Sequence, residues 1–153
     1  MKIIVAIFTN PCVVACIGGW ITAQVIKTVL HAFTYKKLDF RRLLGDGGMP
    51  SGHTATVTAL ATMCGLTEGF GSSAFAISAV LTVVVCRDAV GVRRETEKQA
   101  KMLNKVVDTL EETSGQNISD TPLNTLVGHS PFQIAVGAVI GITVAILLHF
   151  FVF

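Results

Sequence analysis

The sequence has too little charge for a soluble protein. Only 14% of its 153 residues are charged, whereas 51% are hydrophobic. An average soluble domain carries about 25% charged residues and fewer than half apolar ones. The bilayer is therefore the expected solvent, and the length is that of a single domain covering residues 1–153.

Several other patterns are absent, and each absence removes a class of function. None of the four cysteines belongs to a C-x-x-C pair and all lie in apolar runs, which favours buried thiols over a disulfide or a zinc site. No aromatic interleaving or binding module accompanies the basic residues, so no nucleic-acid partner is expected. The spacing of a P-loop is missing. No polar segment follows Cys16, as one would behind a cleaved leader.

What the sequence does contain is a set of apolar runs of membrane-spanning length. A helix rises about 1.5 Å per residue, so about 20 residues cross the roughly 30 Å of hydrocarbon. Residues 12–33 carry one charge, at Lys27, and residues 132–153 carry none. Two further runs lie between them, at residues 53–70 and 73–92. We therefore expect an all-α integral membrane bundle of about four transmembrane helices.

The basic residues are unevenly distributed along the chain. Ten of the twelve Lys and Arg residues lie either between the first two runs or between Arg87 and the last run. The positive-inside rule makes the face that carries them cytoplasmic. Residues 34–52 and about 93–131 are then cytoplasmic loops, and both termini lie on the opposite side. The same residues would attract anionic lipid headgroups.

The third run is expected to continue beyond the bilayer as one long helix. Residues 73–112 contain no proline, and their single glycine is Gly91. Apolar residues recur on one face of the cytoplasmic part, at Val92, Leu103, Val106, Val107 and Leu110. The charges at Glu95, Glu97, Lys98 and Lys101 are typical of a solvated face. In the last run, Gly137 and Gly141 form a GxxxG pair, which permits close helix packing.

Polar residues interrupt the first run. Gln24, Lys27 and His31 are spaced i, i+3, i+7, which places them on one helical face. Ionisable residues within a membrane usually face a bundle interior, so we expect a functional role for Lys27, supported by Gln24. The alternative is that Lys27 extends to the lipid headgroups. For His31, nearer the interface, that alternative is favoured.

The stretch "GGMPSGHT" before the second run has the character of an anion site. Ser51 is a plausible N-cap, so Gly52, His53 and Thr54 would present backbone N–H groups and the positive end of a helix dipole. Phosphate is the natural ligand for such an end. The last run begins in a similar way, because Ser130 can cap its helix and Pro131 suits the first turn.

The predicted topology brings the remaining polar residues to the same leaflet, namely His53, Asp88, Arg93, Arg94 and His129. These are parts for phosphoryl transfer without a metal: one imidazole attacks phosphorus, a second protonates the leaving oxygen, and cations stabilise the equatorial charge. Each also has a structural explanation. The histidines would be helix-end residues, the arginines positive-inside charges, and Asp88 the partner of a neighbouring arginine.

Three blocks, "GGMPSGHTATVTAL", "RDAVGVRRETEKQA" and "VGHSPFQIAVGAVIG", resemble in that order the divergent branch of the type 2 phosphatidic acid phosphatase family. That family is related to acid phosphatases and vanadium-dependent haloperoxidases. The resemblance implies a helical membrane phosphatase that acts on lipid phosphates without metal or cofactor. It assigns His53 as general acid and His129 as nucleophile, and it places Ser51 and Gly52 in the phosphate pocket.

The chain departs from the motifs of that family in two places. The motif K-x6-R-P is absent, and Leu123 and Gln133 stand where the motif S-R-x5-H-x3-D has arginine and aspartate. Gln133 can orient an imidazole by hydrogen bonding but cannot balance an imidazolium. As a hypothesis, Asp88 supplies the missing carboxylate, and Arg93 or Arg94 the guanidinium. Lys27 and both arginines would then bind phosphate.

Two other functions stay open at this point. A non-catalytic lipid-phosphate binder or transporter would keep only the anion site, and a small structural membrane subunit would have neither binding nor turnover. The expected partners are membrane lipids and a lipid phosphate, and four spans make a homodimer plausible. The sequence does not distinguish among phosphatidate, phosphatidylglycerophosphate and polyprenyl phosphates.

Overall fold

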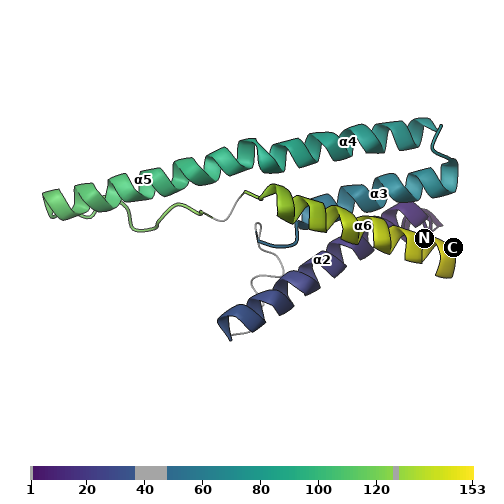
Figure 1. Ribbon diagram of the computed structural model, residues 1–153, viewed down its shortest axis with the longest axis horizontal. Helices are drawn as coiled ribbons and strands as arrows, with labels where there is room; N and C mark the ends of the chain where they lie inside the picture. The colour runs from purple at the N-terminus through teal and green to yellow at the C-terminus, as the bar shows by residue number, and fades with distance from the viewer. Residues whose placement is uncertain (1, 37–47, 126–127) are drawn as a thin grey trace.

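A computed structural model describes residues 2–36, 48–125 and 128–153, and within these ranges the chain is helical with no strand. Figure 1 shows the arrangement of the helices. Their bounds are α1 Lys2–Phe8, α2 Pro11–Tyr35, α3 Gly52–Glu68, α4 Ser73–Val90, α5 Val92–Ser114 and α6 Pro131–Phe151. The expected all-α membrane bundle is confirmed. Of the glycines at positions 45, 47 and 48, which would let backbone approach a ligand, the first two lie outside the described ranges.

Helices α2, α3, α4 and α6 each begin at a polar N-cap. The Asn10 side chain accepts hydrogen bonds from the N–H groups of Cys12 and Val13 at 2.9 and 3.2 Å. Ser51, Ser72 and Ser130 cap α3, α4 and α6 in the same manner. The caps predicted at Ser51 and Ser130 are therefore confirmed. Such a cap contributes about 1 kcal/mol because it gives an acceptor to N–H groups that have no partner within the helix.

Helix α3 lies at the centre of the bundle, against α2, α4 and α6. Its buried residues are mostly small or hydroxylated: Gly52, Thr54, Ala55, Val57, Thr58, Ala59, Met63, Cys64 and Gly65. Among the described residues, three helices are long and apolar enough to cross a membrane, at Pro11–Thr34, Ser73–Ser114 and Pro131–Phe151. The 17 residues of α3 fall just short. The described residues therefore give three candidate spans where about four were expected, and α3 is packed between them.

Glycines let α2 and α6 approach α3 closely. A Cβ added at Gly137 would lie 2.6 Å from the Ser51 carbonyl oxygen, and one at Gly141 would overlap the Ala55 carbonyl oxygen. At Gly19 of α2, an added Cβ would lie 2.9 Å from the same Ala55 oxygen. The Gly137 and Gly141 pair therefore lies at a tight helix interface, as its GxxxG spacing suggested.

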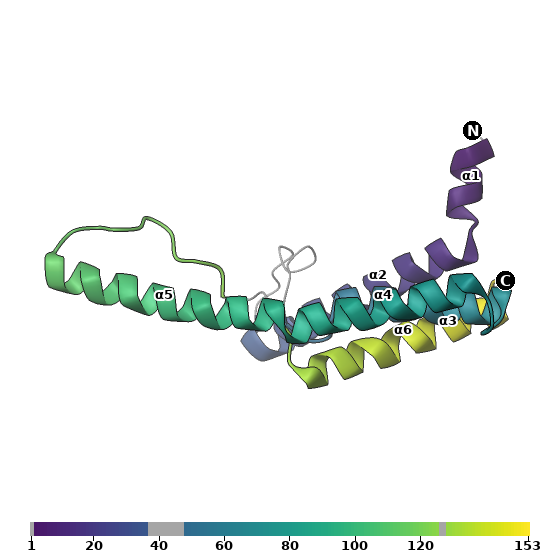
Figure 2. The same ribbon diagram turned by 90° about the horizontal axis from the view of Figure 1, so that it is seen from above.

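Helices α4 and α5 form one long rod with a local break at Gly91. The Gly91 N–H donates to the Arg87 carbonyl at 2.8 Å, and the Glu95 N–H donates to the Gly91 carbonyl at 3.0 Å, so the ladder continues through the break. The two axes stay close to one line in both views (Figures 1 and 2). The predicted helix over residues 73–112 is thus present, interrupted at the glycine. Helix α5 extends past the bundle, and its apolar residues Leu103 and Val106 are exposed.

The opposite end of the bundle holds both termini and an apolar cluster. Ala15, Ala59, Met63 and Ala145 are fully buried there, with Cys12 and Leu148 packed against them. The four cysteines are free thiols, and the sulfurs of Cys12 and Cys64 lie 3.5 Å apart across the α2–α3 interface. Helix α1 turns away from α2 at this end (Figure 2).

Candidate functional site

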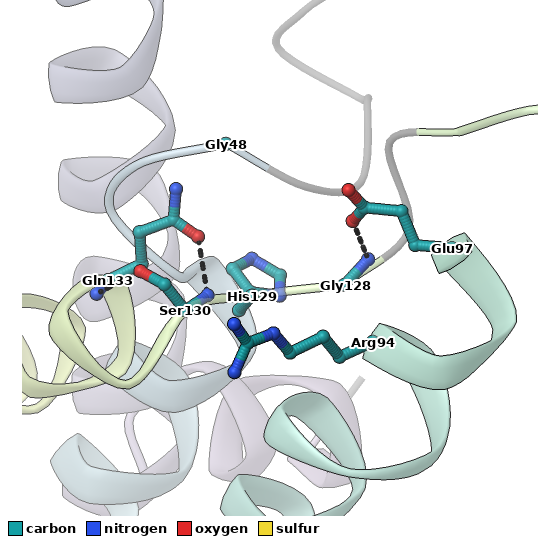
Figure 3. A pocket seen from close by; sticks show the side chains of 7 residues that line it. All are labelled: Gly48, Arg94, Glu97, Gly128, His129, Ser130 and Gln133. Atoms are coloured by element: carbon teal, nitrogen blue, oxygen red, sulfur yellow. Dashed lines mark hydrogen bonds between the residues drawn. The ribbon is translucent and has the colours of Figure 1, made fainter. Parts of the chain in front are cut away.

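A cavity of about 290 Å³ opens at the N-terminus of α6 (Figure 3). Four elements contribute to it: the turn before α3, the first turns of α5, the segment before α6 and the first turn of α6. Its lining residues are Gly48, Arg94, Glu97, Gly128, His129, Ser130 and Gln133. A cavity of this volume is at the lower limit of small-molecule sites, which span roughly 300–1,000 Å³. It suits a compact polar group.

His129 is the buried imidazole of this cavity. The residue is 4% exposed, and its backbone N–H donates to the Ala89 carbonyl at 3.2 Å in the last turn of α4. It directly precedes the Ser130 cap of α6. The imidazole therefore stands ahead of the first turn, at the end of α6 where the helix dipole carries partial positive charge.

Gln133 closes a capping box at the start of α6. Its Oε1 accepts the Ser130 N–H at 2.9 Å, while the Ser130 hydroxyl accepts the Gln133 N–H at 3.3 Å. Because the amide oxygen is held by the cap, Gln133 stabilises the helix start that carries His129. Gln133, which stands where the family motif has aspartate, therefore supports the helix start through its side chain.

The first turns of α5 contribute one cation and one carboxylate. The Arg94 side chain reaches toward the side of the cavity where His129 lies (Figure 3). Glu97 accepts the Gly128 N–H through Oε2 at 3.2 Å and pairs through Oε1 with Lys101 at 2.5 Å. These two partners, Lys101 foremost, hold the pKa of Glu97 below its usual range although burial opposes them. Glu97 therefore stays ionised near neutral pH.

Lys27 and Gln24 lie within the bundle behind the turn that leads to α3. Each residue is 6% exposed. A Cβ added at Gly48 would lie 3.8 Å from Lys27 Cδ, and one added at Gly52 would lie 3.9 Å from Gln24 Cδ. The predicted polar face of α2 thus points inward, and Lys27 does not extend to the headgroups. It packs beside Gly48, which itself lines the cavity.

The start of α3, where the anion site was expected, is closed. Ser51 is fully buried, its N–H donates to the Gln133 carbonyl at 3.3 Å, and its hydroxyl accepts from the N–H and hydroxyl of Thr54 at 3.3 and 3.0 Å. Gly137 of α6 packs on the Ser51 carbonyl. His53 is exposed and is not among the described residues that line the cavity. The structure therefore brings His129 and Arg94 together without His53, Ser51 or Gly52.

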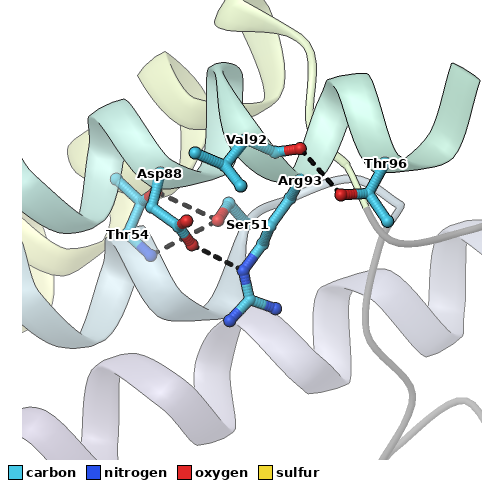
Figure 4. Close-up of polar contacts among 6 residues, drawn as sticks. All are labelled: Ser51, Thr54, Asp88, Val92, Arg93 and Thr96. Atoms are coloured by element: carbon cyan, nitrogen blue, oxygen red, sulfur yellow. Dashed lines mark hydrogen bonds and ion pairs between the residues drawn. The ribbon is translucent and has the colours of Figure 1, made fainter. Parts of the chain in front are cut away.

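Asp88 and Arg93 pair with each other. Arg93 Nε donates to Asp88 Oδ2 at 2.7 Å, with side-chain exposures of 38% and 42% (Figure 4). Neither is among the described lining residues of the cavity. The explanation of Asp88 as partner of a neighbouring arginine is the observed one. Adjacent arginines thus have different surroundings, because Arg93 joins an ion pair and Arg94 faces the cavity.

Gly48 lines the cavity, in keeping with its predicted place beside the ligand, whereas three other lining residues were not predicted as parts of the site: Glu97, Gly128 and Ser130, of which Ser130 was expected only as the cap of α6. Glu97 was expected on a solvated face, which is wrong, since it contacts Gly128 and its side chain is only 22% exposed. A usable signal was its spacing of three from Arg94, which places both on one face of α5. Gly128 had a weaker signal, as a glycine directly before the candidate nucleophile.

Comparisons with known proteins agree with these observations. A family model described as "Divergent PAP2 family" matches residues 8–144. The chain is 34% identical over 154 residues to the uncharacterized membrane protein YuiD of Bacillus subtilis (strain 168), an alignment that covers 95% of this chain and 98% of that protein. No solved structure matches.

Proposed function

Because this membrane protein belongs to the divergent PAP2 family, we propose that it hydrolyses a lipid phosphate monoester through a phosphohistidine on His129. One observation carries the proposal: a buried imidazole shares a compact cavity with the Arg94 guanidinium at the N-terminus of α6. Nucleophile, cation and helix dipole are the parts that phosphoryl transfer to an imidazole requires.

The proposed reaction has two steps. An imidazole nitrogen of His129 attacks phosphorus, and the bond between phosphorus and the lipid oxygen breaks as that oxygen takes up a proton. Water then attacks the phosphorus of the phosphohistidine, which releases inorganic phosphate and regenerates the imidazole. Arg94 and the first turn of α6 stabilise the charge on the equatorial oxygens in both steps. Lys27, buried beside Gly48, adds positive charge behind the cavity.

The leaving oxygen of the lipid needs a proton donor. The resemblance assigns this role to His53, but the His53 side chain is exposed outside the described cavity lining. Its assignment rests on the resemblance alone. The nucleophilic role of His129 does not depend on it, because attack and protonation involve different atoms of the substrate.

The cavity volume limits which part of the substrate it holds. About 290 Å³ accommodates a phosphate and its ester link but not acyl or prenyl chains. The chains would stay in the bilayer, against the exposed apolar side chains of the spanning helices such as Ile77 and Val80 of α4. A substrate with a lipid tail and a small phosphate headgroup fits this arrangement, with the phosphate in the cavity and the tail in the bilayer.

The test is phosphate release by protein in lipid nanodiscs with EDTA present, across phosphatidate, phosphatidylglycerophosphate and a polyprenyl phosphate. We expect release from at least one lipid and an acid-labile phosphoenzyme that His129→Ala abolishes. His149→Ala is the matched control, since His149 lies in the last turn of the same helix. Undiminished release by His129→Ala would overturn the nucleophile assignment.

A second function, non-catalytic binding of lipid phosphate, is favoured by a specific observation. The amide oxygen of Gln133 is held by the capping box, and Asp88 is paired with Arg93, so neither supplies a carboxylate to the His129 imidazole. Saturable binding of a lipid phosphate, with no phosphate release and no phosphohistidine, would establish this function instead.

We further propose that the cavity opens on the cytoplasmic side, which is supported by the concentration of basic residues on α5 and before α3. Ser119, exposed in the segment after α5, reports on this side. A cysteine at Ser119, in a chain lacking the native cysteines, should resist an impermeant maleimide in intact cells and react after lysis. Labelling in intact cells would place the cavity on the outer face.

A further inference from the structure

Three polar side chains on α5 hold the chain that returns toward His129. Glu97, Asn104 and Glu111 are spaced by seven residues, about two helical turns, and so share one face of the helix. The described part of the returning segment, residues 118–125, runs alongside this face (Figures 1 and 2). Within its described residues it has no regular secondary structure, so its backbone groups need other partners.

The three side chains provide such partners along the segment. Glu111 Oε1 accepts the N–H groups of Ile118 and Ser119 at 2.8 and 3.1 Å. The Asn104 amide makes two bonds to Leu123, donating to its carbonyl at 3.0 Å and accepting its N–H at 2.9 Å. Glu97 accepts the Gly128 N–H at 3.2 Å. Helix α5 therefore binds the segment at three places, the last of which is the residue before His129.

At Gly128 the backbone of the segment also packs closely on α5. A Cβ added at Gly128 would lie 2.7 Å from the Arg94 Cα and 3.1 Å from Glu97 Oε2, so the segment lies directly on the first turn of α5. The next residue, His129, donates its N–H to the Ala89 carbonyl of α4. Two consecutive backbone N–H groups are thus fixed to α5 and α4, on either side of the Gly91 break.

The contacts of Glu97 indicate what it does. Oε1 is paired with Lys101 and Oε2 accepts the Gly128 N–H, so both oxygens are already engaged within the protein. A carboxylate in that state is a poor proton carrier for substrate but a firm anchor for the backbone. We propose that Glu97 is a positioning residue, which sets the place of the His129 imidazole through Gly128, and that Asn104 and Glu111 extend this support along α5. The effect of Glu97 on the reaction rate rests on the proposed function, whereas its anchoring of the backbone does not.

The kinetic test compares Glu97→Ala with Glu97→Gln. The amide oxygen of glutamine can still accept the Gly128 N–H, whereas alanine cannot. We expect Glu97→Ala to lower kcat by about 10²-fold with KM changed less than about threefold, because a displaced nucleophile slows the chemical step. Glu97→Gln should restore most of the lost rate. The control is Glu95→Ala, since Glu95 forms an exposed pair with Lys98 and does not line the described cavity.

A second readout does not depend on turnover. Backbone hydrogen exchange of the peptide 125–131, measured by mass spectrometry in nanodiscs, should accelerate at least about tenfold in Glu97→Ala and stay unchanged in Glu95→Ala. Asn104→Ala should accelerate exchange around residue 123 and affect residues 128–129 less. If the wild-type protein releases no phosphate, the proposed function fails while exchange still decides the anchoring. Unchanged exchange in Glu97→Ala overturns the inference, as does a Glu97→Gln variant that is as slow as Glu97→Ala.

Discussion

The N-termini of α3 and α6 look alike in sequence and differ in the structure. Both begin at a serine N-cap with a histidine within two residues. His53 follows its cap by two positions, so it projects from the side of α3 and is exposed. His129 precedes its cap, so it lies ahead of the helix and is 4% exposed beside the cavity. In these two helices the position of the histidine relative to the cap therefore distinguishes an exposed imidazole from one buried at the cavity.

The two helix ends also differ in what covers them. The start of α3 is closed by α6, through the Gln133 carbonyl and the glycine at position 137. The start of α6 has no such cover among the described residues and faces the cavity. A serine cap therefore marks where a helix begins but does not show whether a ligand can reach that end.

The largest expected effect separates the two histidines. His129→Ala should reduce phosphate release more than about 10³-fold, because the nucleophile is lost. His53→Ala should reduce it less than about tenfold, because the exposed side chain is outside the described cavity lining. Steady-state phosphate release from the best lipid measures both. A loss of 10² or more in His53→Ala, the usual range for a general acid, would show that both helix ends serve the reaction.

A smaller effect is expected from opening the closed end. Gly141→Ala introduces a Cβ that overlaps the Ala55 carbonyl oxygen and the Thr58 hydroxyl, so α6 must move away from α3. Overpacking of this kind costs about 1–3 kcal/mol, which thermal unfolding in detergent would detect as a lower Tm. Gly71→Ala is the control, since an added Cβ there meets nothing within 4 Å. An unchanged Tm for Gly141→Ala would mean that the interface is looser than described.

Substitutions of the two serine caps should affect stability and activity differently. Ser51→Ala leaves the buried Thr54 N–H and hydroxyl without their acceptor, which costs about 1–3 kcal/mol. Ser130→Ala should cost about 1 kcal/mol and also slow phosphate release, because Ser130 lines the cavity. Unfolding and release measured on both variants give the comparison. Slower release in Ser51→Ala at temperatures where it is fully folded would contradict a closed α3 terminus.

The smallest effect is expected at Arg93. Its ion pair with Asp88 is more than a third exposed on both sides, and such pairs contribute about 0–1 kcal/mol. Arg93→Ala should therefore unfold close to the wild-type temperature and keep its phosphate release. Arg94→Ala, one residue away in the cavity lining, should weaken lipid-phosphate turnover clearly. Equal losses in the two variants would remove the distinction between them.

Much of the fold could be predicted because it depends on local signals. The caps at Ser51 and Ser130, the long rod across Gly91 and the glycine pair of α6 all follow from short stretches of sequence. The role of α3 could not be predicted in this way. Its intermediate hydropathy reflects the helices around it, and an isolated run gives no information about its neighbours.

The site was predictable only in part, for a similar reason. His129 and Arg94 are residue types whose chemistry marks them in any sequence, and both line the cavity. The spacing of Glu97 from Arg94 places both on one face of α5, but the bond of Glu97 to the Gly128 backbone, 31 positions away, has no local signal in the sequence. Asp88 was a candidate partner of the nucleophile because the predicted topology places both at one leaflet, but in the structure Asp88 pairs with Arg93.

The enclosure of α3 imposes an order on biosynthesis. Helix α6 is synthesised after α3, so the side of α3 that α6 covers has no partner until α6 is made. During that interval its hydroxyls have local acceptors, because Thr56 and Thr58 donate to the carbonyls of Gly52 and Thr54 at 2.8 Å each. In a nascent chain stalled before α6, the hydroxyls of α3 would therefore be satisfied while its α6-facing side stays unpacked. We expect quality-control proteases to recognise α3 in that state.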